Sequence, residues 1–214
     1  MPDADTHEVH LEIEGMTAMW TRADTGDSPV SYPAPTYSAV KGIFESVLWL
    51  KTAEVVPQQV EICSPIVFHN YTTNYGGPLR KSKAKEGSYQ LVATVLINVC
   101  YKLHAIVIND WNAEKFIQSS DKKRKTTNAA HAYKAIFQKN LERGLFYTMP
   151  CLGWKEFVPS YVGPLRQETT PQSDINLTIP SMFKTGFPNG KYTAWQPVFT
   201  RDVHIVDGVL TYAQ

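Results

Sequence analysis

The sequence predicts an α+β fold in which two helices are set among strands. Apolar residues alternate over residues 7–20 and recur with helical spacing over 37–50. Helical spacing returns over about 129–143, after a stretch rich in β-branched residues at 89–109. A helix after the first strand and another after the central strands is the element order of an RRM-like or ferredoxin-like domain. Because that fold serves many functions, it identifies none by itself.

The first strand should present two different faces. Val9, Leu11 and Ile13 form an apolar face, and the residues between them form a face of histidine and glutamate. Gly15 is expected to end the strand, and the glycine and prolines of residues 22–35 predict a loop. The next ordered element is therefore a helix that begins just after this loop.

A cap residue and an internal glycine mark the first helix. Thr36 follows Pro35 and is expected to cap a helix that runs to about Leu50. Gly42 lies inside this helix, where glycine costs about 1 kcal/mol relative to alanine. We therefore expect another chain, a sheet or an RNA backbone to approach closely at Gly42. The apolar face consists of Val40, Phe44, Val47 and Leu48.

Two further elements are predicted in the middle of the chain. Residues 60–68 form a candidate strand that Pro65 interrupts, which indicates an edge strand or a bulge. The second helix is expected to be capped by Thr127 or Asn128 and to stop at Gly144.

The last part of the chain predicts further β-structure. Strand-like pieces occur within residues 146–158. Asp207-Gly208 stands between two apolar segments, 202–206 and 209–212, and this pair predicts a two-residue hairpin turn.

Composition limits the classes of function. The chain has 214 residues, of which 43% are apolar and 19% charged, so a globular protein is expected. Its net charge is +1, whereas a free-standing nucleic-acid-binding domain is usually more basic. Any RNA contact must therefore come from a local patch or from burial shared with partner subunits. Three widely spaced cysteines predict no metal site and no cofactor. The cysteines fit a reducing cytoplasm, and the polar N-terminus predicts no signal peptide. The apolar stretch 91–108 carries Asn98, Lys102 and His104, so it predicts a buried sheet rather than a membrane span.

Two basic segments are candidate RNA contacts. Residues 70–88 combine cations with glycines and a proline, which predicts a long loop or a protruding hairpin. A second basic run covers residues 121–125. Such cations pair with phosphates and release counterions, and an ordinary solvated surface is the alternative. The cations are Arg80, Lys81, Lys83 and Lys85 in the first segment and Lys122, Lys123, Arg124 and Lys125 in the second.

Aromatic side chains are the second kind of candidate RNA contact. A well-filled core and interface is one explanation for the 11 tyrosines, and platforms on which bases stack are the other. Tyr71 and Tyr75 lie beside the first basic segment and are candidates to stack on unpaired bases. Tyr32 and Tyr37, next to the first helix, are further candidates. Lys41 on that helix is a candidate to meet a phosphate.

Five short motifs stand in one order over about residues 9–160. They are Gly15 with Trp20-Thr21-Arg22, the loop and helix from Val30 to Trp49, Ser64-Pro65-Ile66, Asn98-Val99-Cys100-Tyr101, and the run from Pro150 to Phe157. Together they resemble the Cas-five family of CRISPR-associated proteins, subtype I-C. The loop and helix, and the Pro-Cys-Leu-Gly run, are the more specific of the five.

This resemblance implies a fold, a function and a set of partners. It implies an RRM-like domain over residues 1–145 with a basic hairpin at about 70–88, and a β-rich extension over 146–214. The protein would bind the 5′ handle of the guide RNA (crRNA) in the Cascade complex and cap its backbone. Its neighbours would be the large subunit and the first backbone subunit, with target DNA met only indirectly.

The resemblance also implies a reaction, the cutting of precursor RNA without a metal. A ribose 2′-hydroxyl attacks the adjacent phosphorus while acid–base groups move the protons. Family members are thought to use a tyrosine just before the tryptophan that ends the first helix, and a Lys-His pair at the start of the second. This sequence has Leu48 before Trp49, and Ala132-Tyr133 at the position of the pair. Neither family position is retained, so the chain is expected to be either an endoribonuclease or a structural subunit.

His131 is the best single catalytic candidate. Tyr133 and Lys134, in the same helical turn, are the accompanying candidates for proton transfer and charge stabilisation. An exposed helix histidine without function is the alternative for His131. His104 lies in an apolar strand and is expected to be a satisfied core or sheet residue. His10 carries no functional argument from the sequence. An unrelated RRM-like RNA-binding module is the remaining alternative for the whole chain.

Overall fold

The computed structural model describes residues 6–75, 89–109, 129–188 and 194–212. These residues form two helices and eight strands. In chain order the elements are β1 (His7–Ala18), α1 (Tyr37–Val47), β2 (Ala53–Ile62), β3 (Phe68–Tyr75), β4 (Tyr89–Asn109), α2 (Ala129–Arg143), β5 (Tyr161–Gly163), β6 (Leu177–Thr185), β7 (Val198–Val206) and β8 (Val209–Thr211).

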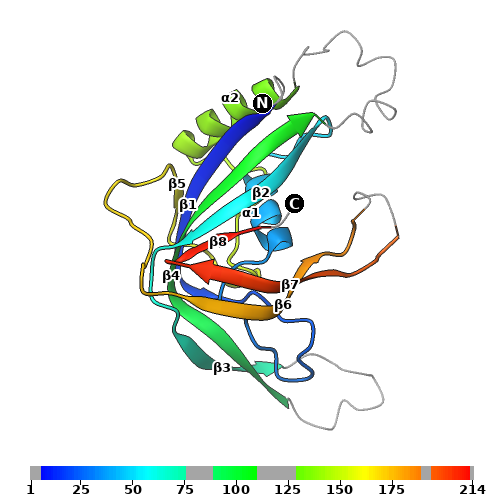
Figure 1. Ribbon diagram of the computed structural model, residues 1–214, viewed down its shortest axis with the longest axis vertical. Helices are drawn as coiled ribbons and strands as arrows, with labels where there is room; N and C mark the ends of the chain where they lie inside the picture. Colours follow the sequence, from blue (N-terminus) through cyan, green and yellow to red (C-terminus); the bar gives the residue numbers. More distant parts are fainter. Residues whose placement is uncertain (1–5, 76–88, 110–128, 189–193, 213–214) are drawn as a thin grey trace.

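All eight strands belong to one curled antiparallel sheet (Figure 1). Its order is β5-β1-β4-β2-β8-β7-β6, and β3 pairs with β4 outside this path. The 21-residue β4 organises the sheet because its second half lies between β1 and β2 while its first half pairs with β3. Helix α2 lies beside β1, and α1 packs near β2.

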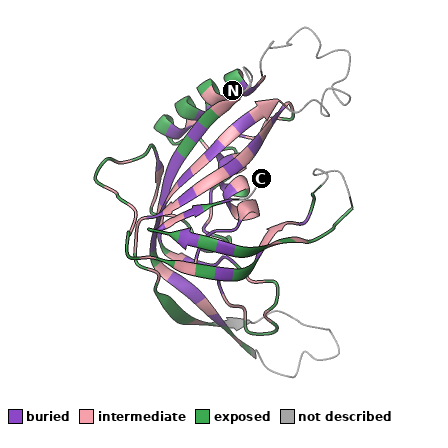
Figure 2. Ribbon diagram, viewed as in Figure 1, coloured by how far each residue is buried: buried purple, intermediate pink, exposed green. Residues whose placement is uncertain are grey.

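The sheet has an apolar face and a polar face. The residues from Val9 to Gly15 with odd numbers are buried, and they pair with buried residues of β4, for example Leu11 with Leu103. This alternation is visible along the strands in Figure 2. Both helices cover the apolar face, where the ring centroids of Phe44 and Phe137 lie 5.6 Å apart. The alternating pattern of the sequence therefore decides which side of the sheet the helices can bury.

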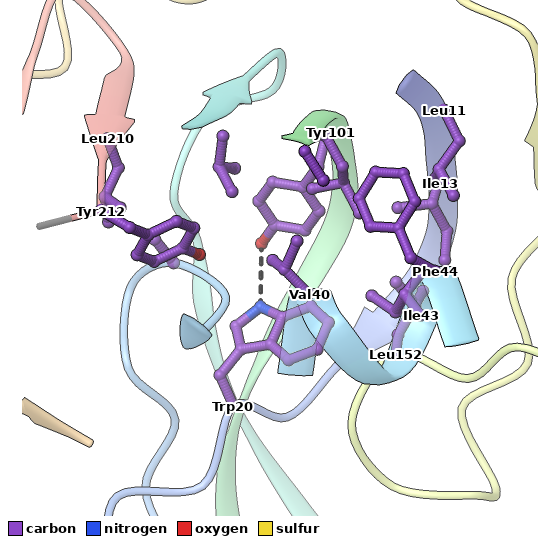
Figure 3. Packing of buried hydrophobic residues seen from close by; sticks show 14 of the residues in the cluster. Leu11, Ile13, Trp20, Val40, Ile43, Phe44, Tyr101, Leu152, Leu210 and Tyr212 are labelled. Atoms are coloured by element: carbon purple, nitrogen blue, oxygen red, sulfur yellow. Dashed lines mark hydrogen bonds between the residues drawn. The ribbon is translucent and has the colours of Figure 1, made fainter. Parts of the chain in front are cut away.

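A buried hydrogen bond orders the aromatic part of the core. The indole Nε1 of Trp20 donates to the hydroxyl of Tyr101 at 3.2 Å, and both side chains are at most 2% exposed (Figure 3). Because a buried polar group without a partner is costly, this bond lets two large aromatic residues fill the core together.

Several predicted elements are confirmed. The first strand, both helices and the long central strand all lie where the apolar spacing places them. Thr36 caps α1 by accepting a hydrogen bond from Ala39 N, at 3.2 Å. Asp207 and Gly208 have φ angles of 51° and 75°, which suit the tight turn that joins β7 to β8. Gly144, with φ 64°, follows the end of α2.

Other predicted boundaries are wrong. Helix α1 ends at Val47 because Leu48 already has extended backbone angles. Gly15 does not end β1, which continues to Ala18. The missing side chain of Gly15 instead makes room for Leu152. The predicted strand 60–68 is split, since β2 covers 53–62 and β3 begins at 68. Residues 146–158 form turns rather than strands.

A side chain at the end of strand β4 caps helix α2. Asn109 Oδ1, at the end of β4, accepts a hydrogen bond from Ala130 N at 2.9 Å. The predicted caps Thr127 and Asn128 lie outside the described residues. A side chain from the sheet therefore satisfies a backbone donor in the first turn of the helix and ties that turn to the end of β4.

Strands from both sides of the predicted boundary at residue 145 share the sheet. β5 pairs with β1, and β8 pairs with β2. The division into a domain and an extension stays a prediction. Of the helices described, neither is long and apolar enough to cross a membrane.

Candidate nucleic-acid interface

The face of the sheet turned away from the helices carries a row of ionisable side chains. His10 of β1 lies directly opposite His104 of β4, and Glu12 lies opposite Lys102. Lys102 in turn pairs in register with Glu61 of β2. We call this surface the polar sheet face, defined by Glu8, His10, Glu12, Glu14, Cys100, Lys102, His104, Gln59 and Glu61.

A buried carboxylate occupies one half of the polar sheet face. Glu12 is fully buried and accepts hydrogen bonds from Arg166 N at 2.8 Å, Arg166 Nε at 2.7 Å and Thr169 Oγ1 at 2.9 Å. Burial by itself would raise the pKa of Glu12, but the hydrogen bonds from Arg166 and Thr169 lower it. Glu14 and Glu12 both raise the pKa of Arg166 through their hydrogen bonds.

This ion pair fastens a long connection over the sheet. Arg166 also contacts Glu14, at 2.5 Å, and stands 4.3 Å over the ring of Tyr161. Lys102 Nζ donates to the carbonyl of Thr169 at 2.5 Å. The segment after β5 therefore covers the Glu12 half of the face, whereas His10 in the histidine half is exposed.

The histidine half contains a close imidazole pair. The ring centroids of His10 and His104 lie 5.3 Å apart, and His10 is exposed. Nε2 of His104 lies 2.9 Å from Oε1 of Glu61. This close contact does not have hydrogen-bond geometry. Burial, the neighbouring His104 and the charge of Lys134 lower the pKa of His10, and Glu8 opposes this effect.

The catalytic candidates from the sequence lie at the first turns of α2, on the other side of β1. His131 is exposed, and its ring centroid is 5.3 Å from that of His7. Tyr133 is only 1% exposed and donates its hydroxyl to the carbonyl of Leu48 at 2.8 Å. Burial raises the pKa of Tyr133. This burial gives Tyr133 a structural role in joining the two helices and no path to a substrate. Lys134 is partly buried.

The described RNA-binding candidates do not form one groove. Tyr32 is 3% exposed, and its hydroxyl accepts a hydrogen bond from Phe183 N at 3.2 Å. Lys41 pairs with Glu54 at 2.7 Å. Lys41 and Tyr71 belong to opposite ends of β4, because Glu54 is in register with Ile108 and Tyr71 with Ala93. Lys41 and Tyr71 therefore lie far apart along the sheet, and an RNA contact of either one stays a prediction.

The first basic segment joins two paired strands. Tyr75 ends β3 opposite Tyr89, so the two strands lead into and out of this segment. The remaining candidates lie outside the described residues: Arg80, Lys81, Lys83, Lys122, Lys123 and Arg124. At Gly42 nothing within the described part of the chain lies within 4 Å of an added Cβ. Any close approach there must come from outside this part of the molecule.

A cavity of about 380 Å³ lies between α1 and the β6–β7 pair. Tyr37 lines it, with Lys184 Nζ 5.5 Å above the tyrosine ring. Phe183, His204 and Tyr212 are also part of the wall. Tyr37, a predicted RNA-binding tyrosine, therefore borders this cavity.

The sequence predicted the histidine and glutamate face of β1, but it did not predict which residues of β2 and β4 join that face. His104 was expected to be a satisfied sheet residue, and His10 carried no argument. The available signal was the period of two that places His10 on the same face as Glu12. The sequence does not show the register between β1 and β4, and this register places His10 opposite His104 rather than opposite another residue of β4.

Comparisons with known proteins agree with the motif pattern. A family model described as CRISPR-associated protein (Cas_Cas5), of the Cas5d type, matches residues 9–183. The chain belongs to the Cas5 family. The subtype I-C resemblance of the Cas5 motifs is thereby confirmed.

Two curated proteins are similar to this Cas5 chain, and both are named CRISPR pre-crRNA endoribonuclease Cas5d. The one from Thermus thermophilus is 25% identical over 83% of this chain and 72% of its own. The one from Mannheimia succiniciproducens is 26% identical over 81% of this chain and 82% of its own. A crystal structure titled CRISPR-associated Protein has the same fold, with a TM-score of 0.69 at 17% identity. The structural match covers 97% of this chain and 92% of the chain in that crystal structure.

No cluster of three or more His, Cys, Asp or Glu side chains that could hold a metal ion occurs within the described ranges. The three cysteines are free, and Cys100 is buried at the edge of the Glu12 cluster, 3.6 Å from Glu12 Oε1.

Proposed function

We propose that this Cas5 chain is the subunit of a subtype I-C interference complex that holds the 5′ handle of the guide RNA and cuts its precursor. The proposal includes contacts with the large subunit and the first backbone subunit. The observation that carries it is the family match over residues 9–183 together with two relatives named pre-crRNA endoribonuclease. A location in the cytoplasm accompanies this function.

The topology supports an RNA-binding role. Strands in the order β5-β1-β4-β2, with α1 after β1 and α2 after β4, follow the arrangement of a ferredoxin-like domain. RRM domains, which share this arrangement, bind single-stranded RNA on the sheet face opposite the helices. The corresponding surface here is the polar sheet face. The strands β3 and β4, with residues 76–88 between them, would form the arms of the basic hairpin.

The proposed cleavage needs no metal. The 2′-hydroxyl of a ribose displaces the 5′-oxygen of the next nucleotide, and ionisable side chains move the protons. Leu48 replaces the tyrosine of the family, and Tyr133 is buried, so these two positions supply no proton. This departure favours a second candidate function, an RNA-holding subunit that does not cut.

An incubation in EDTA separates the two functions. The purified full chain is mixed with labelled RNA that carries one repeat of the organism's own CRISPR array. We expect a single cut that leaves a 2′,3′-cyclic phosphate, together with stable binding of the handle fragment. RNA that is bound but stays intact would reject the nuclease and retain the holding subunit. The absence of both binding and cutting would reject the proposal as a whole.

The sequence-based assignment of the catalytic side chain is tested in the same assay. If His131 transfers a proton, the variant His131→Ala loses cutting while it still binds the repeat RNA. Cutting at the wild-type rate would reject His131.

Charge reversal tests the first basic segment. We expect the double variant Lys81→Glu and Lys83→Glu to bind guide RNA more weakly, because each phosphate that is no longer neutralised keeps its counterions. For single-stranded RNA, the slope of log K against log salt should fall by about 0.7 per such phosphate. Binding is measured by fluorescence anisotropy over a range of salt concentrations. The exposed Lys139, changed to Glu, serves as the control. Unchanged affinity and slope in the double variant would remove this segment from the interface.

A further inference from the structure

We propose that His10 and His104 are the general base and general acid of the RNA cleavage, an inference that rests on the function proposed above. The site would lie on the histidine half of the polar sheet face, separated by β1 from the His131 position. Its substrate would be a single-stranded ribose-phosphate backbone laid across β1 and β4.

The geometry places the exposed imidazole of His10 beside the partly buried imidazole of His104. His10 and His104 are direct cross-strand partners, with ring centroids 5.3 Å apart and ring planes tilted by 58°. A phosphodiester group laid over the edges of the two rings would bring its oxygens close to both of them. Within the described residues, β5 pairs with β1 only at 12–14, so that pairing does not extend to His10. A flexible strand can therefore approach this end of the sheet.

The surrounding charges differ at the two rings. The Glu61 carboxylate lies 2.9 Å from Nε2 of His104 and holds that ring in place. Its negative charge therefore lies beside His104, the side chain that must carry a proton as the general acid. Nδ1 of His104 is then the nitrogen that faces a substrate. Lys134, reaching from α2, acts electrostatically on His10 and can stabilise the charge that develops on phosphate oxygens.

The state of His10 suits a base. Burial, His104 and Lys134 lower its pKa below the ordinary value of 6.5, and Glu8 opposes them. His10 is therefore mostly neutral at pH 7 and able to accept a proton. On the acidic side of the profile, the cleavage rate should rise with pH as His10 loses its proton, in a window below about pH 6.5.

The proposed step is balanced. The 2′-hydroxyl gives its proton to His10 while its oxygen forms a bond to phosphorus. The bond from phosphorus to the 5′-oxygen breaks, and the imidazolium of His104 gives its proton to that leaving oxygen. The products are a 2′,3′-cyclic phosphate and a 5′-hydroxyl. His10 has gained the proton that His104 lost, and exchange with water restores both rings.

Glutamine variants test the pair. His10→Gln and His104→Gln preserve size and polarity, and their folding is checked by urea unfolding. With labelled repeat RNA in EDTA under single-turnover conditions, we expect each variant to cut about 100-fold more slowly or worse. RNA affinity should remain close to that of the wild type. The acidic limb of the pH profile should disappear in His10→Gln.

Another exposed histidine provides the matched control. His69→Gln changes a histidine of β3 away from the pair, and this variant is expected to cut at the wild-type rate. An unaffected rate in His10→Gln or in His104→Gln would overturn the pair and leave the proposed cleavage standing. A wild-type chain that binds the RNA without cutting it would instead reject the cleavage and, with it, this inference.

Discussion

Replacing Arg166 with methionine should lower the free energy of unfolding by about 3–5 kcal/mol, the usual cost of leaving a buried charge unpaired. Glu12 has no exposed surface, and Arg166 supplies two of its three close hydrogen bonds. One of these comes from the backbone and survives the change, but the charge that balances the carboxylate does not. Methionine fills a similar volume, so loss of packing contributes little to the expected effect.

Urea unfolding as a function of pH provides the measurement. In the wild type, the folded-state pKa of Glu12 is lowered. Its contribution to stability is therefore complete above the unfolded value of about 4.3 and is lost as the pH falls through the folded value. In Arg166→Met the buried carboxylate of Glu12 has lost its balancing charge, so taking up a proton stabilises the folded state. The difference in free energy of unfolding between the variant and the wild type should therefore narrow on acidification.

A neighbouring carboxylate controls for simple loss of charge. Glu14 also contacts Arg166, but its side chain is 41% exposed. We expect Glu14→Gln to change stability by less than about 1 kcal/mol, as for other exposed ion pairs. Equal losses of stability in Glu14→Gln and Arg166→Met would contradict the proposal that Arg166 balances the charge of Glu12. A stability difference between Arg166→Met and the wild type that widens in acid would contradict it as well.

Replacing Gly153 with alanine should destabilise the fold by about 3 kcal/mol or more, because two constraints act together. Gly153 has φ 93°, which side-chain-bearing residues rarely adopt. An added Cβ would also stand 1.9 Å from the carbonyl oxygen of Met19 and 2.7 Å from its carbon. Both contacts are with backbone, so no side-chain movement relieves them.

The effect has a structural meaning for the Pro-Cys-Leu-Gly run. Met19 N donates to the carbonyl of Leu152 at 2.9 Å, and Leu152 packs where Gly15 has no side chain. The run therefore holds the region after α2 against the end of β1. The measurement is thermal and urea unfolding of Gly153→Ala, with a drop in Tm of about 2–4 °C for each kcal/mol.

Gly42 is the matched control. It lies in α1 with nothing within 4 Å of an added Cβ, so Gly42→Ala should stabilise the isolated chain by up to about 1 kcal/mol. A similar loss of stability in Gly153→Ala and Gly42→Ala would contradict the argument that the backbone of Met19 leaves no room for a Cβ at Gly153. If RNA or a partner subunit does reach the backbone at Gly42, the same variant should assemble less well despite its higher stability.

Local patterns in the sequence were sufficient for the elements whose own residues carry the signal. The signals were the period of two in β1, the β-branched residues of β4, the helical spacing of α1 and α2, and the Asp207-Gly208 turn. All of them act between near neighbours in the chain. β5 has only three residues and shows no period. Its position is set by pairing with β1, which lies far away in the sequence.

The candidate site was less predictable for the same reason. His131 was selected from its position at the start of a helix, and the structure places it beside His7. The interactions that shape the polar sheet face join residues remote in sequence. Arg166 meets Glu12 across 154 positions, and His104 meets His10 through strand register.

By itself, the sequence determined the Cas5 family, the order of most elements and the face of each strand that is buried, because motifs and hydrophobic period are properties of short segments. The tertiary structure alone decided which ionisable side chains meet. Charges interact over a few ångströms of space, and only folding brings β1, β2, β4 and the segment after β5 within that distance.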